Sequence, residues 1–595
     1  MTIYFDQKPQ KTSDVIVFCN DEPQKGIKHT NFDVRDLINE SQNELTNVVV
    51  SIYLKLHAVL KTNVKAWRFS SISRLLIWSS STKSYQIRDV YIALAIAKLS
   101  KLSDSDIYVV GASESAAMHI AAFVESHALK GLNAKKVRNG VLLNYFLSLI
   151  QQIAISSVFF VLNHWRSPKR KDNSLGDYWV ITTRFDQRPS KKPDHFFGDL
   201  FQKTPGDQLR TTWVYDNPRF FPLSDLEPRT IGHEGRYENT LLFAHVRIAD
   251  IIKAISEDIR LHREFRALEK SEKFWASISE ASEAFVAKTI LAQVGSSSSS
   301  YSQILRHYAF KRMIERKRPK VIFYPYEGKV AEATLLAAVS ASEAKINTVG
   351  FAHACYSNGH LFTKYYSVIP ELMPKIFAVT GQRPANFFQS AGVPKSRIVK
   401  VGSSRHKELV CDSPPLWSKN SKRLRVLFIS SLGFEYLNFA KMLVRYPELS
   451  KSFDIFIRRS PHSWKFEQDY GDEILANAGV HFGRADSDLS EEVLASDVVL
   501  FEFTTAAYQA SLLGRLIAKV KVFETFETAH FEPGLSAGDY LDCCLDGDGL
   551  LDMLSEVSEW SIDHYRAVAN SQREAVCGIY EPANFLGFES FIYDK

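Results

Sequence analysis

The chain of 595 residues is poor in cysteine, and its few cysteines form no pattern. They are Cys19, Cys355, Cys411, Cys543, Cys544 and Cys577. No two of them have the Cys-x-x-Cys spacing of a zinc site, and no regular spacing indicates a disulfide framework. The composition therefore speaks against structural zinc and is typical of a protein in a reducing compartment.

A strong excess of one charge is also missing. Lys and Arg number 73 and Asp and Glu number 67, which leaves a net charge of only +6. Proteins that bind nucleic acid usually carry a larger or more clustered basic excess, so we predict no nucleic-acid partner. The first residues, MTIYFDQKPQKTSD, lack the apolar core of a secretory signal, which predicts a cytoplasmic protein.

One stretch of the chain lacks charge altogether. Between Asn139 and Trp165 there is no Lys, Arg, Asp or Glu. The flanking basic residues are Lys135, Lys136 and Arg138 on one side and Arg166, Lys169, Arg170 and Lys171 on the other. Roughly 20 apolar residues can cross a bilayer as a helix, but basic residues at both ends do not fit a one-way span. We expect a helix or helical hairpin in the interface of the inner membrane; a long buried helix that packs two domains is the alternative.

Short apolar runs alternate with helix-length segments over most of the chain. The runs are Val15–Cys19, a run near Leu75, Asp106–Gly111, Tyr178–Thr183, Thr211–Asp216, Val321–Glu327, Asn347–His353, Lys375–Gly381, Arg397–Gly402, Arg425–Ser431, Phe453–Arg459 and Asp497–Phe503. Continuous apolar strands between helices are typical of parallel sheets that are covered on both faces. Because the runs are too many for one open sheet, we predict an α/β fold of two doubly wound, Rossmann-like domains that face a cleft.

The boundary between the two domains is predicted where the alternation is interrupted. The aromatic and glycine-containing segment between His353 and Lys375 breaks it, so residues 1–365 form the first domain and residues 366–595 the second. The hydrophobic segment 139–165 is then a helical insertion in the first domain. The serine-rich stretch 295–302 predicts a flexible loop in the same domain.

Two polar residues follow neighbouring strand runs of the first domain. Glu327 ends the run VIFYPYE, and His353 ends the run NTVGFAH. Ligands of open α/β sheets bind at the carboxyl ends of the strands, so both side chains should face the same crevice. A carboxylate and an imidazole suit general base catalysis or the stabilisation of a cationic transition state. Alternatively, Glu327 only stabilises the positive N-terminus of the following helix.

Two blocks of the second domain are candidates for anion binding. The run FDIFIRR leads into cationic and hydroxyl residues at a strand end, which can hold a phosphate or carboxylate: Arg458, Arg459, Ser460 and His462. Thr504 and Thr505 follow the run DVVLF and precede an alanine-rich helix, whose N-terminal amides attract anions. In the alternative interpretation, these threonines only cap that helix.

These segments resemble GT-B glycosyltransferases of bacterial surface carbohydrates, including those of capsule and lipopolysaccharide synthesis. The resemblance rests on YPYEGK…NTVGFAHA, PKIFAVTGQRPANFFQSAGVPKSRIVKVGSSR and ASDVVLFEFTTAAYQASLLGRLIA, and covers about residues 321–522. It implies an acceptor-side first domain and a nucleotide-sugar-binding second domain. It also implies a growing surface polysaccharide or lipid-linked glycan as acceptor, with the enzyme peripheral to the inner membrane.

The resemblance implies a role for each candidate residue. Glu327 acts as the base, or as nucleophile if the sugar retains its configuration, and His353 positions a substrate. The residues implied in nucleotide-sugar binding are Arg458, His462, Ser463, Thr504, Thr505 and Gln509. Gln509 stands where many relatives have a Glu that bonds the nucleotide ribose. Such enzymes usually need no bound metal, so we predict neither metal nor cofactor. Asp486 and Asp488 have the spacing of a metal-binding Asp-x-Asp motif, but they lie in a polar loop before a helix, so we predict that they cap that helix.

The donor nucleotide is only weakly indicated. Transferases that use CMP-activated sialic acid or Kdo have a His-Pro pair followed by a Ser/Thr motif. Here the order is Pro461-His462, followed by Thr504-Thr505. The similarity therefore favours a CMP-activated acidic sugar slightly over a UDP or GDP sugar.

Three other functions are compatible with the sequence. They are a nucleotide-sugar epimerase of the same architecture, a transferase of polyol phosphate, and a non-catalytic scaffold of a polysaccharide assembly complex. An epimerase would convert the donor without an acceptor, and a polyol-phosphate transferase would give a product of different mass. A scaffold would show no turnover.

Overall fold

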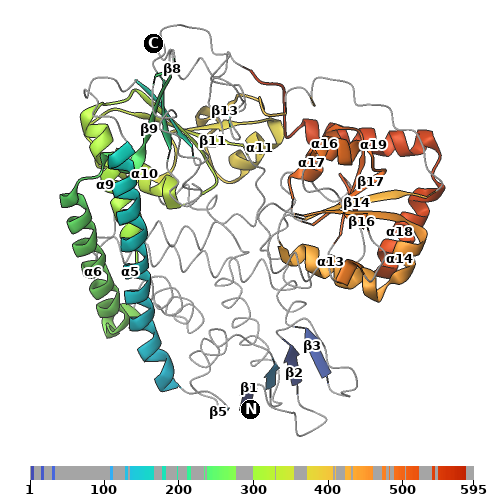
Figure 1. The fold of residues 1–595 in the computed structure, drawn as a ribbon, viewed down its shortest axis with the longest axis horizontal. Helices are drawn as coiled ribbons and strands as arrows, with labels where there is room; N and C mark the ends of the chain where they lie inside the picture. Colours follow the sequence, from blue (N-terminus) through green and yellow to red (C-terminus); the bar gives the residue numbers. More distant parts are fainter. Residues whose placement is uncertain are drawn as a thin grey trace.

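The structure is a computed structural model, and Figure 1 shows the described parts as ribbons. It describes residues 2–5, 15–18, 30–33, 107–110, 128–130, 134–166, 177–182, 197, 211–215, 233–234, 237–276, 299–328, 330–353, 372–406, 409, 423–430, 433–459, 472, 474–476, 481–482, 488–502, 504–520, 539–542 and 547–584.

The described strands form three sheets, which we call the N-terminal, central and C-terminal sheets. The N-terminal sheet has the order β3 (Thr30–Asp33), β2 (Val15–Phe18), β4 (Ile107–Val110), β1 (Thr2–Phe5) and β5 (Ala128–Lys130), and all its pairs are parallel. The central and C-terminal sheets are the two Rossmann-like units that the sequence predicts. The N-terminal sheet is an additional parallel sheet.

The central sheet is the largest of the three. Its order is β13 (Ile398–Lys400), β12 (Ile376–Val379), β11 (Asn347–Ala352), β10 (Val321–Pro325), β6 (Tyr178–Thr182), β7 (Thr211–Tyr215), β9 (Tyr237–Leu241) and β8 (His233–Glu234). Only β8 runs antiparallel to its neighbour among the described strands. Because β11 pairs with β12 and β12 with β13, the sheet continues past residue 365, where the sequence analysis places the domain boundary. The change from one sheet to the next lies between β13 and β14.

The C-terminal sheet is parallel throughout its described strands. Its order is β16 (His481–Phe482), β15 (Asp454–Arg458), β14 (Arg425–Ile429), β17 (Val498–Phe501), β18 (Leu516–Lys519) and β19 (Leu541–Asp542). Helices cover both of its faces. Alternate residues of β14 belong to two separate apolar clusters: Val426 and Phe428 to one, Leu427 and Ile429 to the other.

The predicted strand runs correspond to strands wherever the structure describes them. The run near Leu75 lies outside the described residues. Strands β10 and β17 are buried at every position, which explains why they read as continuous apolar runs rather than as alternating ones. The predicted α/β class with parallel sheets is confirmed.

The helices pack on these sheets or connect them (Figure 1). They are α5 (Ala134–Arg166), α6 (Ile248–Glu269), α7 (Glu272–Ala276), α9 (Tyr301–Arg316), α10 (Val330–Ser340), α11 (Gln382–Ser390), α13 (Gly433–Arg445), α14 (Pro447–Ser452), α16 (Leu489–Leu494), α17 (Ala506–Leu512), α18 (Gly547–Glu559) and α19 (Ile562–Cys577), with 3-10 helices η4 (Leu242–His245) and η8 (Lys395–Arg397).

The hydrophobic segment 139–165 lies within one continuous helix, α5, so a hairpin is excluded. One side of α5 packs inward: the Tyr145 hydroxyl donates to Asp258 of α6 at 3.0 Å, and its ring stacks on His262 at 3.8 Å. Among the described helices, none combines the length and the apolar character that crossing a membrane requires.

The described part of the serine-rich stretch does not form the predicted flexible loop. Ser299 and Ser300 are buried, and both bond to the Asp258 carboxylate, through the Ser299 hydroxyl at 2.9 Å and the Ser300 amide at 2.5 Å. Tyr301 and Ser302 already belong to α9. A carboxylate that accepts several hydrogen bonds fixes the chain here, because leaving it unpaired in the interior costs free energy.

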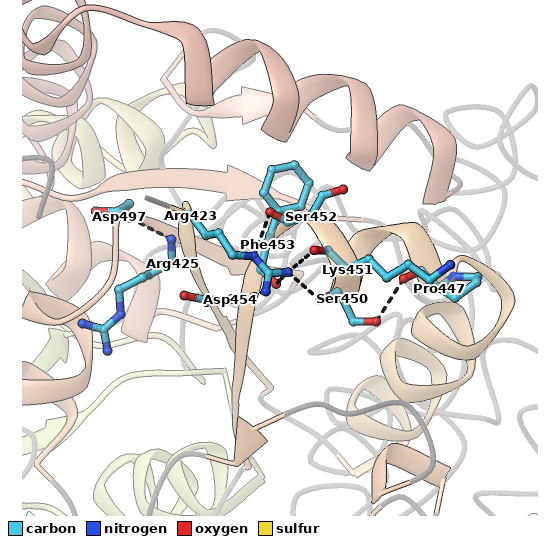
Figure 2. Close-up of polar contacts among 9 residues, drawn as sticks. All are labelled: Arg423, Arg425, Pro447, Ser450, Lys451, Ser452, Phe453, Asp454 and Asp497. Atoms are coloured by element: carbon cyan, nitrogen blue, oxygen red, sulfur yellow. Dashed lines mark hydrogen bonds and ion pairs between the residues drawn. The ribbon is translucent and has the colours of Figure 1, made fainter. Parts of the chain in front are cut away.

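The strands of the C-terminal sheet are fastened at their starting edge by two charged residues (Figure 2). Arg423 donates to the backbone oxygens that end α14, including Ser450 at 2.9 Å, and forms an ion pair with Asp454 at 3.5 Å. A cation is favourable at a helix C-terminus, where the carbonyl groups are unpaired. The Asp497 carboxylate accepts the Arg425 amide at 2.7 Å. The opposite, carboxyl edge of this sheet is the one that carries the candidate anion-binding residues.

The C-terminal part of the chain returns to the central sheet after α19. The Glu581 amide donates to the Thr380 carbonyl at 2.8 Å, and the Asn584 amide donates to the Val401 carbonyl at 2.8 Å. Gly402 has φ of 72° and lies so close to Pro582 that a Cβ atom would approach its carbonyl oxygen to 2.1 Å. Only glycine fits where the segment after β13 passes this close to the segment after α19.

We predict that acid weakens the fold partly through His307. Burial, and less strongly the charge of Lys311, lower the pKa of His307 to about 4. Below its ordinary pKa of about 6.5, the unfolded chain binds a proton that the folded chain does not, so stability falls as the pH falls towards 4. When the pH is lowered from roughly 7 to 5, the free energy of unfolding should therefore fall by about 2 kcal/mol less in His307→Gln than in the wild type.

Urea unfolding curves at the two pH values measure this difference. Taking the difference between the two pH values for each protein removes the packing cost of the substitution itself. Equal losses in both proteins would contradict the assignment.

Candidate active site

The structure brings Glu327 and His353 into direct contact. The Nε2 atom of His353 lies 3.0 Å from Oε1 of Glu327, a distance that suits a hydrogen bond or, with a protonated ring, an ion pair. The two side chains are mostly buried, with 10% of His353 and 22% of Glu327 exposed. A carboxylate and an imidazole that are joined in this way, yet still reach solvent, can pass a proton to or from a bound substrate.

The contact follows from the pairing of β10 with β11. These strands are parallel, with Tyr324 opposite Gly350 and Pro325 opposite Phe351. The Tyr326 amide extends the pairing by donating to the Phe351 carbonyl at 2.8 Å. Glu327 and His353 each lie two residues beyond Pro325 and Phe351, the last register pair of these two strands, so they leave the carboxyl edge side by side.

Glu332 holds the turn that carries Glu327. Its two carboxylate oxygens accept the Glu327 amide and the Gly328 amide, each at 2.9 Å. Gly328 has φ of 70°, which glycine adopts without strain. A carboxylate in the first turn of α10 also interacts favourably with the positive end of that helix. Glu332 therefore stabilises the start of α10, which is the role that the alternative interpretation gives to Glu327.

Buried aromatic side chains pack next to this edge of the central sheet. The Tyr326 hydroxyl donates to the Met373 sulfur at 3.2 Å, and its ring lies edge-on to Phe377 at 5.2 Å. Burial, and second the negative charge of Glu332, raise the pKa of Tyr324 and Tyr326 well above the ordinary value. Both phenols therefore stay protonated at neutral pH and serve as packing groups.

Arg458 lies at the carboxyl end of β15, as predicted, but its charge is engaged. It forms an ion pair of 2.6 Å with Glu492 of α16, and only a quarter of its side chain is exposed. An anionic ligand at Arg458 must therefore compete with a carboxylate of the protein. His462 and Ser463 lie outside the described residues.

The threonine pair lies at the start of α17. The Thr504 hydroxyl accepts the Ala506 amide at 3.2 Å, which is a local cap, while the side chain of Thr505 makes no such bond to the helix. Gln509 donates to the Ser490 hydroxyl of α16 at 2.9 Å. Arg458 and Gln509 thus both contact α16, through Glu492 and Ser490.

The predicted cap at the start of α16 is confirmed for Asp488, whereas Asp486 lies outside the described residues. Asp488 is the N-cap residue, and its carboxylate accepts the Ser490 amide at 2.9 Å. Within the described ranges, no three or more His, Cys, Asp or Glu side chains gather in a way that could hold a metal ion.

Two carboxylates of this region, Glu332 and Glu502, were not predicted from the sequence. Glu332 has a signal that could have found it, an acidic residue in the first helical turn after a strand-end loop. Glu502, which is 2% exposed at the end of β17, has none, because a Glu between Phe501 and Phe503 is typical of an ordinary strand end. Its burial becomes visible only when the sheet is assembled.

Comparison with known proteins gives a likeness of fold. No family model matches the sequence, and no curated protein matches it. HepE from Anabaena, solved in complex with UDP and glucose, is 13% identical over 70% of this chain and 98% of its own, with a TM-score of 0.38. The wall teichoic acid polymerase TagF is 9% identical over 78% of this chain and 99% of its own, with a TM-score of 0.35.

A third structure is α,α-trehalose 6-phosphate synthase from Burkholderia multivorans. It is 9% identical over 71% of this chain and 96% of its own, with a TM-score of 0.40. At these identities and TM-scores, the likeness carries no argument about substrate or reaction.

We predict that Glu332→Ala destabilises the protein by about 2 kcal/mol, because two amides lose a charged acceptor. Thermal or urea unfolding measures the loss. Glu343→Ala is the matched control, since Glu343 is an exposed carboxylate just after the same helix. A Glu332→Ala protein as stable as the control would show that the turn does not depend on this carboxylate.

Proposed function

We propose that this protein is a glycosyltransferase that moves a sugar from a nucleotide-sugar donor to a hydroxyl of a growing surface polysaccharide or lipid-linked glycan. The observation that carries the proposal is the 3.0 Å contact between Glu327 and His353 at the carboxyl edge of the central sheet. Ligands of parallel α/β sheets bind at that edge. The resemblance of the surrounding segments to GT-B transferases supports the same assignment.

In the proposed reaction, Glu327 takes the proton of the acceptor hydroxyl. The hydroxyl oxygen forms a bond to the anomeric carbon, while the bond from that carbon to the phosphate oxygen breaks. The departing nucleotide keeps the electron pair of that bond. His353 holds the Glu327 carboxylate in place through its 3.0 Å contact, and the negative charge of that carboxylate favours the cation-like sugar.

On the donor side, we assign the nucleotide to the carboxyl edge of the C-terminal sheet. Arg458, Thr504 and Thr505 are the candidate phosphate contacts, and Gln509 is the candidate ribose contact. His462 and Ser463 follow β15 in the sequence and complete the set. Arg458 must exchange its contact with Glu492 for one with phosphate, which suits a group that binds the leaving phosphate only when substrate is present.

The finer parts of the proposal concern donor and location. We place a CMP-activated acidic sugar first among the donors, because Thr504-Thr505 follows Pro461-His462. The reaction as proposed uses no metal and no cofactor, since side-chain cations and hydroxyls stabilise the leaving group. A lipid-linked acceptor places the enzyme at the inner membrane surface, as a peripheral protein.

We expect the correct nucleotide to raise the melting temperature. Binding to the native state stabilises a protein by roughly 2.7 kcal/mol at a hundredfold excess over the dissociation constant. Melting curves with CMP, UDP and GDP identify the nucleotide. Arg458→Gln should reduce the shift, whereas Lys451→Gln, at an exposed lysine of α14, should not. An equal shift in the Arg458 variant would remove Arg458 from the donor site.

We expect Glu327→Gln to lower sugar transfer by roughly a hundredfold or more, because a neutral amide cannot accept the hydroxyl proton. The nucleotide-induced melting shift should remain, since Glu327 lies on the acceptor side. Sugar transfer is measured by mass spectrometry of the product, with Glu343→Gln as the control. Transfer near the wild-type rate would take Glu327 out of the mechanism.

The same measurements separate the other functions. Conversion of the donor in the absence of any acceptor identifies an epimerase. A product heavier by a polyol phosphate identifies the teichoic-acid type of reaction. Nucleotide binding without turnover of any donor identifies a scaffold.

A further inference from the structure

The outward side of α5 carries an apolar stripe. Its exposed members are Leu143 (59%), Phe146 (47%), Leu147 (55%), Ile150 (62%), Val158 (56%) and Val161 (61%). At about 100° per residue, these positions fall within an arc of roughly 120° on the helix, and they span about 27 Å of its length. An exposed apolar patch of this extent usually marks an interaction site.

The opposite side of α5 is fixed to the protein. Tyr145, Leu149 and Ser156 are buried there. Gln152 donates to the Ser299 carbonyl at 2.9 Å and accepts the Ser302 amide at 3.0 Å. With these bonds in place the helix cannot rotate to bury the stripe.

The charged residues that flank the stripe in the sequence have one sign. From Ser126 to Lys171 the sequence contains no Asp or Glu. Its basic residues are Lys130, Lys135, Lys136, Arg138, Arg166, Lys169, Arg170 and Lys171, and those from Lys135 to Lys171 stand before and after the uncharged stretch. An apolar helix face with basic residues at both ends is complementary to a surface that is apolar inside and anionic outside.

We propose that α5 docks the protein on an anionic lipid membrane, with the helix parallel to the surface and the stripe inserted among the lipid chains. This inference deepens the proposed location and rests on it only for the choice of membrane. A second copy of this chain is the less favourable occupant. Two α5 helices paired along their stripes bring basic ends against basic ends, in parallel or antiparallel orientation, and like charges repel.

The test is co-sedimentation of the full chain with lipid vesicles. The wild type should bind vesicles of phosphatidylcholine mixed with phosphatidylglycerol, and bind vesicles of phosphatidylcholine alone much less. Replacing both Leu147 and Ile150 by Gln should weaken binding by roughly tenfold or more, since both side chains are more than half exposed. The matched control replaces Val444 of α13 and Ile562 of α19 by Gln; these exposed apolar residues lie outside the stripe, and binding should not change.

A charge-reversed protein separates the two parts of the interaction. Changing Lys135 and Lys136 to Glu should weaken binding to the anionic vesicles and leave any residual binding to phosphatidylcholine unaltered.

Three results would overturn the proposal. The first is no binding of the wild type to anionic vesicles, and the second is equal binding by the stripe variant and its control. The third is a wild type that is dimeric in light scattering and a stripe variant that is monomeric but binds lipid as well as the wild type. This result would assign the stripe to contact with a second copy. The nucleotide-induced melting shift should be the same in all these proteins, so failure of the docking proposal leaves the proposed transferase function standing, and the reverse also holds.

Discussion

The parallel pairing of β10 with β11 is the constraint on which the candidate active site depends. Strands that run in the same direction end at the same edge, and the register of Pro325 against Phe351 makes the next residues leave that edge in step. Glu327 and His353 are brought together by this register, although a helix separates them in sequence. A shift of one residue would turn one side chain to the other face of the sheet and break the contact.

Buried or half-buried carboxylates that accept backbone amides recur as fastening points in this chain. Glu332 fixes the turn before α10, Asp258 fixes the start of α9, and Asp497 fixes the start of β14 to that of β17. Each bonds an amide in a turn or at the start of a helix or strand. A charged acceptor is stronger than a neutral one at such places, so single carboxylates hold turns that apolar packing alone leaves loose.

How far the sequence predicts the structure depends on the range of the interaction. Buried strands such as β10 and β17 can be predicted from their uninterrupted apolar residues. The contact of Glu327 with His353 follows from the parallel direction of their strands, which end at the same edge. The ion pair between Arg458 and Glu492 does not, because it joins segments whose approach is set by the assembled sheet. The flexible loop predicted at Ser299 and Ser300 is wrong for a related reason. Serines are typical of loops, and their acceptor, Asp258, is far away in the sequence.

The return of the chain to the central sheet has a consequence for protein synthesis. The carbonyl groups of Thr380 and Val401 receive the amides of Glu581 and Asn584, which are made only after the whole C-terminal sheet. A nascent chain on the ribosome therefore cannot complete the edge of the central unit until residues 581–584 have emerged. Domains usually finish folding in the order in which they are translated. Here the central unit starts earlier than the C-terminal unit and is closed later.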